Sequence, residues 1–154
     1  MTTSPTIHAT AVLIGAKAIL IRGPSGSGKS SLAWQLIQTS GSPALPFARL
    51  IGDDRVHVEA TNGRLLVRPA PALAGLIEVR GLGIRQLLHE PVAQIGLIVD
   101  LAEPAAARLP APETSEITLS GIAMPRLPVA PGQAAMPLLL AWLGTAAATG
   151  RNAN

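Results

Sequence analysis

The strongest constraint on this chain is the run GPSGSGKS, which extends from Gly23 to Ser30. An apolar segment, Ala18 to Arg22, precedes the run, and apolar residues recur at helical spacing after it, from Ser30 to Gln38. A glycine-rich loop that joins a strand to a helix and ends in Gly-Lys-Ser is the P-loop pattern. The alternative is a glycine-rich turn with a solvated lysine, and the flanking strand and helix argue against it.

Each residue type in this loop suits the binding of phosphate groups. The glycines permit a backbone path on which N–H groups converge, and the positive end of the helix dipole lies beside them. Lys29, one of only two lysines in the chain, supplies a mobile cation for the β- and γ-phosphates, and the Ser30 hydroxyl is a hard ligand for Mg²⁺. The predicted nucleotide contacts are Gly23, Pro24, Ser25, Gly26, Ser27, Gly28, Lys29 and Ser30.

Length and composition limit the remaining possibilities. With 154 residues, nearly half of them apolar, the chain has the size of one domain, which we assign to residues 1–150 with a frayed tail at 151–154. The sequence has no cysteine, which excludes disulfides and thiolate metal sites and favours a reducing compartment. Scattered arginines, with no signal peptide and no long apolar run, predict a cytoplasmic protein without nucleic-acid or membrane partners.

A P-loop also needs an acidic residue at the end of a neighbouring strand, and two segments compete for this role. Ile95 to Asp100 is the longer apolar run that ends in aspartate, whereas Leu50-Ile51-Gly52 is shorter and precedes Asp53-Asp54. Adjacent carboxylates repel each other unless a cation or a shared proton relieves them, so one could ligate Mg²⁺ while the other accepts a hydroxyl proton. A turn or helix cap is the alternative at Asp53-Asp54, and a turn carboxylate is the interpretation we favour for Asp100.

The rest of the chain predicts a mixed α/β domain. Asn62-Gly63 lies between two alternating segments and tolerates the positive φ of a type I′ turn, so we expect a hairpin there. The other expected elements are strands at 11–13, 49–51, 94–101 and 117–122, a loop at 103–114, an extended segment at 125–132 and a terminal helix at 134–148.

Together, these motifs resemble a known family. His8, the P-loop, Leu50 to Val56 (LIGDDRV) and Leu76 to Ile84 (LIEVRGLGI) are similar to HPr kinase/phosphorylase, which modifies a serine of HPr, the phosphocarrier of bacterial sugar-transport phosphorelays. The resemblance implies an α/β P-loop kinase domain of the HPr kinase/PEP carboxykinase-like type, a mixed sheet with flanking helices. It covers the catalytic domain alone. We therefore expect a short form, as in alphaproteobacteria, without the N-terminal domain of long members.

The resemblance also implies roles for individual residues. Asp53 would accept the proton of the HPr serine, while His8 and Lys29 would contact the transferring phosphate. Without the resemblance, His8 is a surface or structural histidine ahead of a strand, and Glu78 could pair with Arg80 in an exposed ion pair. The implied catalytic residues are His8, Lys29, Asp53 and Arg108, and the implied Mg²⁺ ligands are Ser30, Asp54 and Glu78.

The function implied by the resemblance is an ATP-dependent protein-serine kinase that phosphorylates HPr with Mg²⁺, in a homo-oligomer that we expect to be a hexamer. Two positions depart from the family pattern: Ser31 replaces the usual glutamate after the P-loop, and Gln133 replaces the arginine of a Pro-Gly-Arg segment. Since the lost arginine removes a fixed charge for phosphate, we expect weak or lost phosphorylase activity. The alternatives are a nucleotide-binding regulatory module without catalysis and a small-molecule P-loop kinase.

Overall fold

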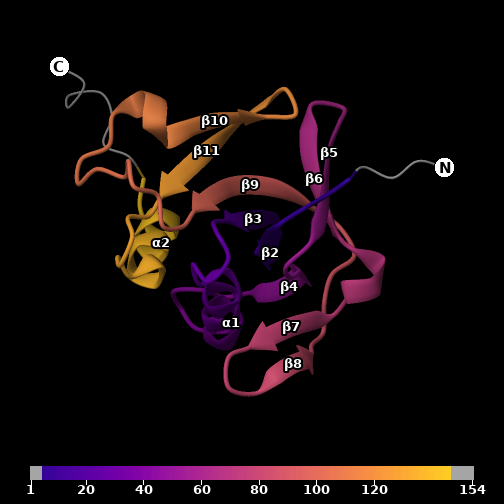
Figure 1. Ribbon diagram of the computed structural model, residues 1–154. Coiled ribbons are helices and arrows are strands. Elements are labelled where there is room, and N and C mark those ends of the chain that lie inside the picture. The colour runs from indigo at the N-terminus through magenta and orange to yellow at the C-terminus, as the bar shows by residue number, and fades with distance from the viewer. Residues whose placement is uncertain (1–4, 147–154) are drawn as a thin grey trace.

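The structure is a computed structural model that describes residues 5–146, which form strands, two helices and two short 3-10 turns (Figure 1). In chain order the elements are β1 (Thr6–Ile7), β2 (Ala9–Ile14), β3 (Lys17–Arg22), α1 (Lys29–Thr39), β4 (Ala48–Gly52), β5 (Val56–Thr61), β6 (Arg64–Pro69), η1 (Pro71–Leu73), β7 (Leu76–Val79), β8 (Gly83–Gln86), β9 (Ala93–Asp100), η2 (Pro112–Ser115), β10 (Glu116–Leu119), β11 (Ile122–Pro128) and α2 (Ala135–Gly144).

One mixed sheet holds most of these strands. Its order is β1-β5-β6-β9-β3-β2-β4, with β11 paired to β9 and β10 paired to β11. Strand β9 runs parallel to β3 and to β11, as the pairs Leu20–Ile98 and Leu127–Val99 show. Strand β2 pairs antiparallel with both β3 and β4. The mixed sheet and its helices agree with the fold class expected from the sequence.

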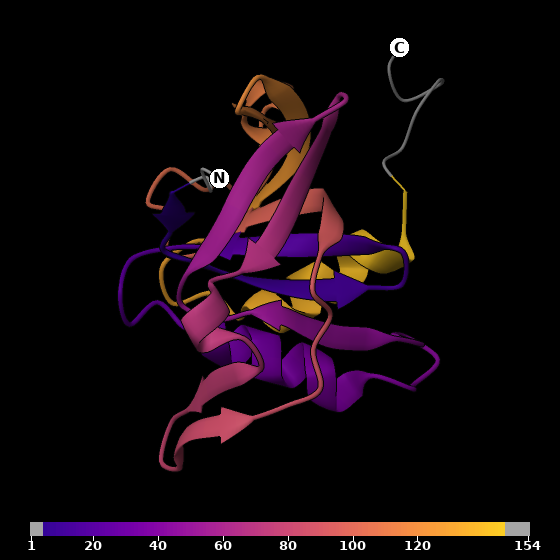
Figure 2. The same cartoon turned by 90° about the vertical axis from the view of Figure 1, so that its right-hand side faces the viewer.

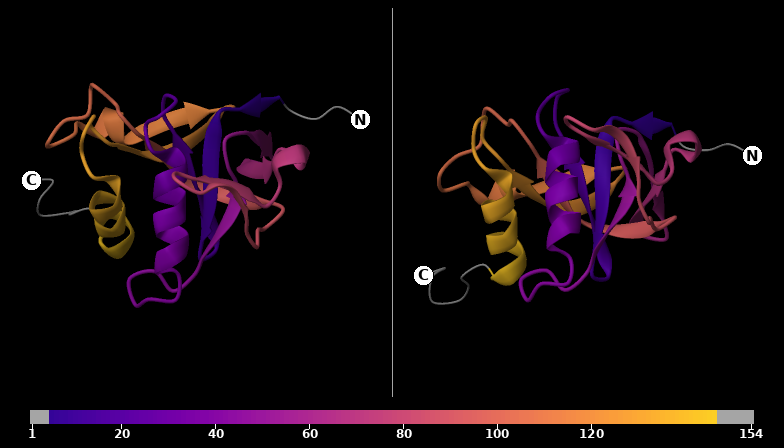
Figure 3. Two further views of the ribbon diagram at one scale, coloured as in Figure 1. Left: turned by 60° about the horizontal axis from the view of Figure 1, so that its bottom comes forward. Right: turned by 90° about the horizontal axis from the view of Figure 1, so that it is seen from below.

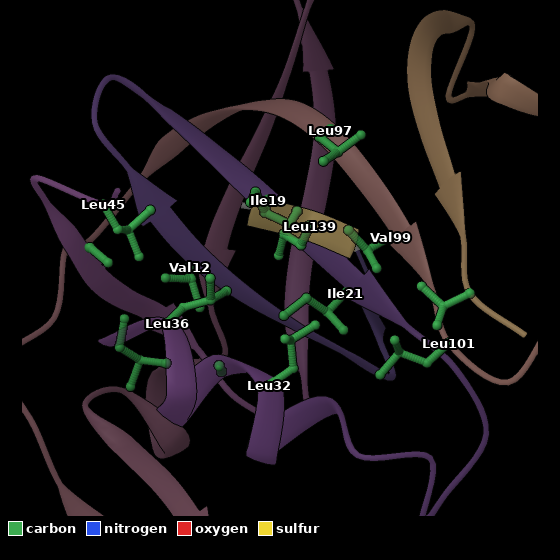
Figure 4. Close-up of a cluster of buried hydrophobic side chains, with 14 of the residues drawn as sticks. Val12, Ile19, Ile21, Leu32, Leu36, Leu45, Leu97, Val99, Leu101 and Leu139 are labelled. Atoms are coloured by element: carbon green, nitrogen blue, oxygen red, sulfur yellow. The ribbon is translucent and has the colours of Figure 1, made fainter. Parts of the chain in front are cut away.

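Both helices lie on one face of the curled sheet, where they run side by side (Figure 3). Helix α1 buries Leu32 and Leu36, four residues apart and therefore on one face of the helix. Figure 4 shows these two side chains in one cluster with Ile19 and Ile21 of β3, whereas Leu20 belongs to a second cluster. Strand β3 is thus buried on both faces. The P-loop begins directly after this buried strand. Within residues 5–146, no helix is long and apolar enough to cross a membrane.

Two hairpins project from this body (Figure 2). Strands β5 and β6 meet at Asn62 and Gly63, whose φ angles of 52° and 76° confirm the predicted turn. Strands β7 and β8 form a separate two-stranded sheet, and β7 packs beside α1 through the buried side chain of Ile77. This second hairpin brings Glu78 close to the P-loop.

Two predictions for the C-terminal third are wrong. The expected single strand at 117–122 is a hairpin, because Ser120 and Gly121 turn the chain with φ angles of 50° and 80°. Ser-Gly is a dipeptide that marks turns, so the sequence carried a signal for this turn that the expected single strand overlooked. The expected helix at 134–148 is shorter: α2 ends at Gly144, and Thr145 is extended with φ −134° and ψ 169°. The last two residues of that predicted helix and the predicted tail at 151–154 lie outside the described residues.

Candidate active site

The P-loop has the backbone shape that its glycines allow. The φ angles of Gly26 and Gly28 are 80° and 98°, in the left-handed region that favours glycine. The Ser27 N–H donates to the Pro24 carbonyl at 3.0 Å, and α1 begins directly after the loop at Lys29. The loop therefore ends at a helix N-terminus, where free N–H groups and the helix dipole attract anions.

Lys29 is buried, and its ammonium group folds back over the loop. Its Nζ donates to the carbonyls of Gly23 at 2.8 Å and Pro24 at 3.1 Å. Burial lowers the pKa of Lys29 below its ordinary value, and the negative charges of Asp54 and Asp53 offset part of this effect. Both carbonyl partners are neutral, so an anionic phosphate oxygen would be a stronger partner for the same ammonium group.

Asp53 is only 4% exposed and accepts hydrogen bonds from three different elements. Ser30 Oγ, from α1, lies 2.7 Å and 2.8 Å from the two carboxylate oxygens. Thr10 Oγ1, from β2, donates to Oδ1 at 2.7 Å, and the Glu78 N–H, from β7, donates to Oδ2 at 3.0 Å. Asp53 thus ties the start of α1 to the sheet and to the β7–β8 hairpin.

Asp54 faces a different environment from Asp53, because the backbone turns sharply between them. Asp54 has a φ of 71°, and the Arg55 N–H donates to the Asp53 carbonyl at 2.8 Å. The Asp54 side chain is 63% exposed, and its Oδ1 lies 3.0 Å from His8 Nε2. The turn separates two adjacent carboxylates that would repel each other if they shared one site.

Two surface hollows meet beside these carboxylates. The loop hollow is lined by His8, Ser25, Gly26, Gly28, Lys29, Ser30, Ser31, Asp54, Glu78 and Arg80. The hairpin hollow is lined by Ser30, Asp53, Asp54, Leu73, Leu76, Ile77, Glu78 and Ile84. The two hollows share Ser30, Asp54 and Glu78, which are the three residues predicted to hold Mg²⁺.

The donors of these shared residues suit a hard cation. Ser30 offers a hydroxyl oxygen, and Asp54 and Glu78 offer carboxylates; Mg²⁺ prefers oxygen ligands of this kind. Within residues 5–146 no group of three or more His, Asp or Glu side chains is arranged to hold a metal by itself. In phosphoryl-transfer sites Mg²⁺ is usually held by one or two carboxylates together with phosphate oxygens and water.

Asp100, the competing acid in the sequence, is engaged in a cluster of ion pairs. Arg22 binds it through two hydrogen bonds of 2.7 Å and 2.8 Å, and Arg126 Nε lies 2.6 Å from Oδ2. Arg126 also binds Glu103 at 2.9 Å. Burial alone would raise the pKa of Asp100, but the hydrogen bonds and charges of the two arginines outweigh burial and lower it. Both carboxylate oxygens are thus occupied by arginines, so Asp100 is an ion-pair partner, whereas the sequence interpretation we favoured was a turn carboxylate.

The same region holds the first residue of the P-loop. The Leu101 N–H, directly after Asp100, donates to the Arg22 carbonyl at 2.8 Å. A Cβ added to Gly23 would lie 3.1 Å from Leu101 Cβ and 2.5 Å from Ser27 Oγ, so only glycine fits without movement. The position of Gly23 therefore depends on the end of β9.

Arg108 is the predicted catalytic residue that lies outside both hollows. It lines a separate hollow with Arg126 of β11 and Trp142 of α2. Conversely, sequence analysis missed Thr10, whose only signal is a hydroxyl within an apolar strand. The sequence analysis placed Arg80 in the stretch that resembles the family and treated it as a possible partner for Glu78, and the structure shows that it lines the loop hollow beside the P-loop.

Comparison with known proteins identifies the family of this chain. A sequence profile described as the HPr Serine kinase C-terminal domain matches residues 1–141. The chain belongs to this family. Relatives named HPr kinase/phosphorylase include one from Mycoplasma mycoides, 34% identical over 109 residues, which are 65% of this chain and 33% of the relative. Another, from Limosilactobacillus reuteri, is 39% identical over 103 residues, or 62% and 30% of the two chains. The match with this HPr kinase domain thus spans about a third of each relative.

A solved structure supports the fold of the HPr kinase domain. It is described as the structure of the Hpr(Ser) kinase/phosphatase from Coxiella burnetii, and it superposes with a TM-score of 0.70 at 23% sequence identity. The alignment covers 90% of this chain and 93% of the other. The mixed sheet with its two helices is therefore a shared architecture, although most residues differ.

Proposed function

We propose that this domain is an ATP-dependent protein-serine kinase that transfers the γ-phosphoryl group of ATP to a serine of HPr. The observation that carries the proposal is the junction of the two hollows, where Ser30, Asp54 and Glu78 lie between the P-loop and Asp53. The names of the curated relatives support HPr as the protein partner. We also propose a cytoplasmic location and a homo-oligomer, by analogy with the family.

The nucleotide side of the proposed reaction is the loop hollow. The P-loop amides and Lys29 would hold the phosphate tail, and Lys29 would exchange its bonds to two loop carbonyls for bonds to phosphate oxygens. His8, which borders the same hollow, would lie beside the transferring group. These positive and polar groups are fixed before the reaction, and such preorganised charge carries most of the rate in phosphoryl transfer.

The metal set is Ser30, Asp54 and Glu78, and Mg²⁺ bound there would neutralise charge on the phosphate oxygens. Asp53 holds the Ser30 hydroxyl in place through bonds of 2.7 Å and 2.8 Å. The chain itself therefore orients the serine that would serve as a ligand. Asp54 is the more exposed of the two aspartates and can reach both hollows.

The acceptor side is the hairpin hollow, which Asp53 lines. In the proposed step the serine oxygen of HPr forms a bond to the γ-phosphorus and its proton passes to Asp53. The bond between the γ-phosphorus and the bridging oxygen breaks, and ADP leaves. Asp54 is the competing proton acceptor because it lines the same hollow with greater exposure, and paired variants described below separate the two roles.

We further propose that the reverse reaction, removal of phosphate from phosphoserine, is weak or lost. Gln133 stands where the family pattern has arginine, and its Oε1 accepts the Ala130 N–H at 3.1 Å. The Gln133 N–H donates back to the Ala130 carbonyl at 3.0 Å. A neutral side chain that closes its own turn offers no charge to an incoming inorganic phosphate.

The test is a phosphotransfer assay with the purified chain, HPr and Mg-ATP, read as the gain of one phosphate in the intact mass of HPr. We expect transfer by the wild type and none by Lys29→Met. Phosphorylated HPr with inorganic phosphate tests the reverse direction, where we expect little turnover. ATP binding without any transfer would refute the kinase and favour a regulatory nucleotide-binding module. Transfer to a small molecule but not to HPr would favour a small-molecule kinase.

A further inference from the structure

Thr10 is a fully buried hydroxyl on the face of the sheet that carries α1. Side chains alternate along a strand, so Thr10 shares its face of β2 with Val12, a member of the core cluster against α1. Its partner across the ladder is Ile21, another member of that cluster, and Figure 4 shows Val12 and Ile21 there. Valine has nearly the shape of threonine and would suit such a position. A buried hydroxyl is unfavourable unless it forms hydrogen bonds, so the bonds that Thr10 makes account for its presence.

An irregularity in the pairing of β2 with β4 brings this hydroxyl to the site. The register shifts between Ala11 and Val12, and after the shift Ala11 lies opposite Gly52. One residue further along the two antiparallel strands are Thr10 and Asp53. Thr10 Oγ1 accordingly meets the Asp53 carboxylate and donates to Oδ1 at 2.7 Å. Bulges of this kind often redirect a side chain beside an active site.

The three donors to Asp53 differ in what else they do. Ser30 and Glu78 both belong to the proposed metal set, so their bonds to Asp53 lie where Mg²⁺ and the phosphate tail would bind. Thr10 lines neither hollow, and its single proton is committed to the carboxylate. Its oxygen also lies 3.5 Å from the Asp54 N–H, a long contact with the turn that separates the two aspartates. Thr10 is therefore the donor to Asp53 that stands outside the binding surfaces.

We propose that Thr10 is a positioning residue for Asp53, an inference that rests on the proposed kinase function. The bond from a β-branched side chain inside the sheet fixes the rotation of the carboxylate, because threonine itself has little rotational freedom. The orientation of the carboxylate sets the direction from which it can accept the serine proton. A small error in such an orientation lowers the rate of transfer without weakening the binding of either substrate.

The test compares steady-state transfer to HPr by Thr10→Val and Thr10→Ser. Thr10→Val keeps the shape of the side chain and loses the hydroxyl, whereas Thr10→Ser keeps the hydroxyl and loses a buried methyl group. We expect Thr10→Val to lower kcat by roughly tenfold to a hundredfold, with the KM for HPr and the affinity for Mg-ATP unchanged. Thr10→Ser should retain kcat within about threefold, since serine offers the same proton but rotates more freely.

Urea unfolding of the same variants separates positioning from a purely structural role. If Thr10 only supports the fold, kcat should follow stability, and Thr10→Ser should lose as much activity as an equally destabilised variant. Ile95→Val is the matched core control, because it also removes one buried carbon. Ile95 lies in the core cluster on the opposite face and pairs with Ala18 near the start of β3, whereas the P-loop follows the end of that strand. Ile95→Val should keep wild-type kinetics.

A double-variant cycle shows whether Thr10 acts through Asp53. In the Asp53→Asn background, Thr10→Val should cause no further loss of the residual transfer, because the group that Thr10 orients is already gone. If Thr10→Val does not fold, Thr10→Ala removes the same hydroxyl in both backgrounds.

Wild-type kcat in Thr10→Val, or an equal loss in Thr10→Ser, would overturn the positioning role while the kinase stands. Additive losses in the cycle, or a raised Mg²⁺ requirement at unchanged kcat, would assign the effect elsewhere and also overturn it. Absence of transfer in the wild type would refute the proposed function and this inference together.

Discussion

Asp53 and Asp54 are consecutive residues with different surroundings. The residues alone left open which of the two carboxylates binds Mg²⁺ and which accepts the proton, and the family resemblance implied that Asp53 accepts the proton and Asp54 binds the metal. Asp53 is surrounded by Ser30, Thr10 and the Glu78 N–H, whereas Asp54 lies in the open beside His8. The positive φ of Asp54 turns the backbone between the two residues, so their side chains face different surroundings. Aspartate tolerates this angle, but no sequence pattern predicts it.

The pair of variants Asp53→Asn and Asp54→Asn separates their roles. We expect Asp53→Asn to bind ATP normally but to lose transfer by roughly a hundredfold or more, because a general base of this kind contributes about that much. Asp54→Asn should instead raise the Mg²⁺ concentration needed for half-maximal transfer, since it removes a carboxylate ligand. Calorimetry with ATP and the HPr mass assay at several Mg²⁺ concentrations measure both effects. The opposite pattern would make Asp54 the proton acceptor.

At the scale of elements, the sequence predicted those elements that depend on residues close together in the chain. The strand–loop–helix around the P-loop and the Asn62-Gly63 hairpin follow from glycine, apolar spacing and turn preference, and the structure confirms them. The turn at Ser120-Gly121 and the early end of α2 were missed. In both cases a local signal stands at the break, Ser120-Gly121 in the first and Gly144 in the second, and the prediction gave more weight to the apolar residues on either side.

The Asp100 cluster links the ends of three strands, and we predict that it makes stability depend on acid pH. A carboxyl with a lowered folded-state pKa stabilises the protein above its ordinary pKa and loses this contribution as pH falls through the folded value. Asp100→Asn should lower the free energy of unfolding at pH 7 by about 2 kcal/mol, because Arg22 and Arg126 lose a largely buried partner. Urea unfolding at pH 7 and below pH ~4, the ordinary aspartate range, measures both quantities.

A matched control for this cluster is the surface pair of Arg68 and Glu59. Both side chains are more than two-fifths exposed, at 45% and 44%, so solvent screens their attraction. Glu59→Gln should change the free energy of unfolding by less than about 1 kcal/mol. The assignment fails if Asp100→Asn is as stable as Glu59→Gln at pH 7, or if its stability falls with acid as steeply as that of the wild type.

At the scale of the whole molecule, the order of strands could not be predicted. Strand β9 lies between segments from early and late in the chain, and nothing local in Ile95 to Asp100 specifies β3 and β11 as its partners. The two core clusters on opposite faces of the sheet can be assigned only after the strand order is known. The sequence also could not predict that Arg108 lies outside the loop hollow and the hairpin hollow. Its position depends on the path of the long connection that follows β9.

Nucleotide binding should stabilise the whole domain. Mg-ATP at a hundredfold excess over its dissociation constant should raise the free energy of unfolding by about 2.7 kcal/mol, since it binds only the folded state. Lys29→Met should lose most of this gain. Its stability without nucleotide should stay close to that of the wild type, because the cost of burying the Lys29 ammonium offsets its attraction to Asp54 and Asp53. Thermal unfolding with and without Mg-ATP measures both. Equal stabilisation of wild type and variant would remove Lys29 from the phosphate site.

The contacts that position Gly23 have a consequence for how the domain folds during translation. The loop residues emerge early from the ribosome, but their anchor at Asp100 and Leu101 is translated much later, and Arg126 later still. A nascent chain that stops before β9 therefore lacks the bonds that hold Arg22 and the start of the loop. Ribosome-bound chains of increasing length should acquire ATP affinity only after β9, and in full only after β11, has left the exit tunnel.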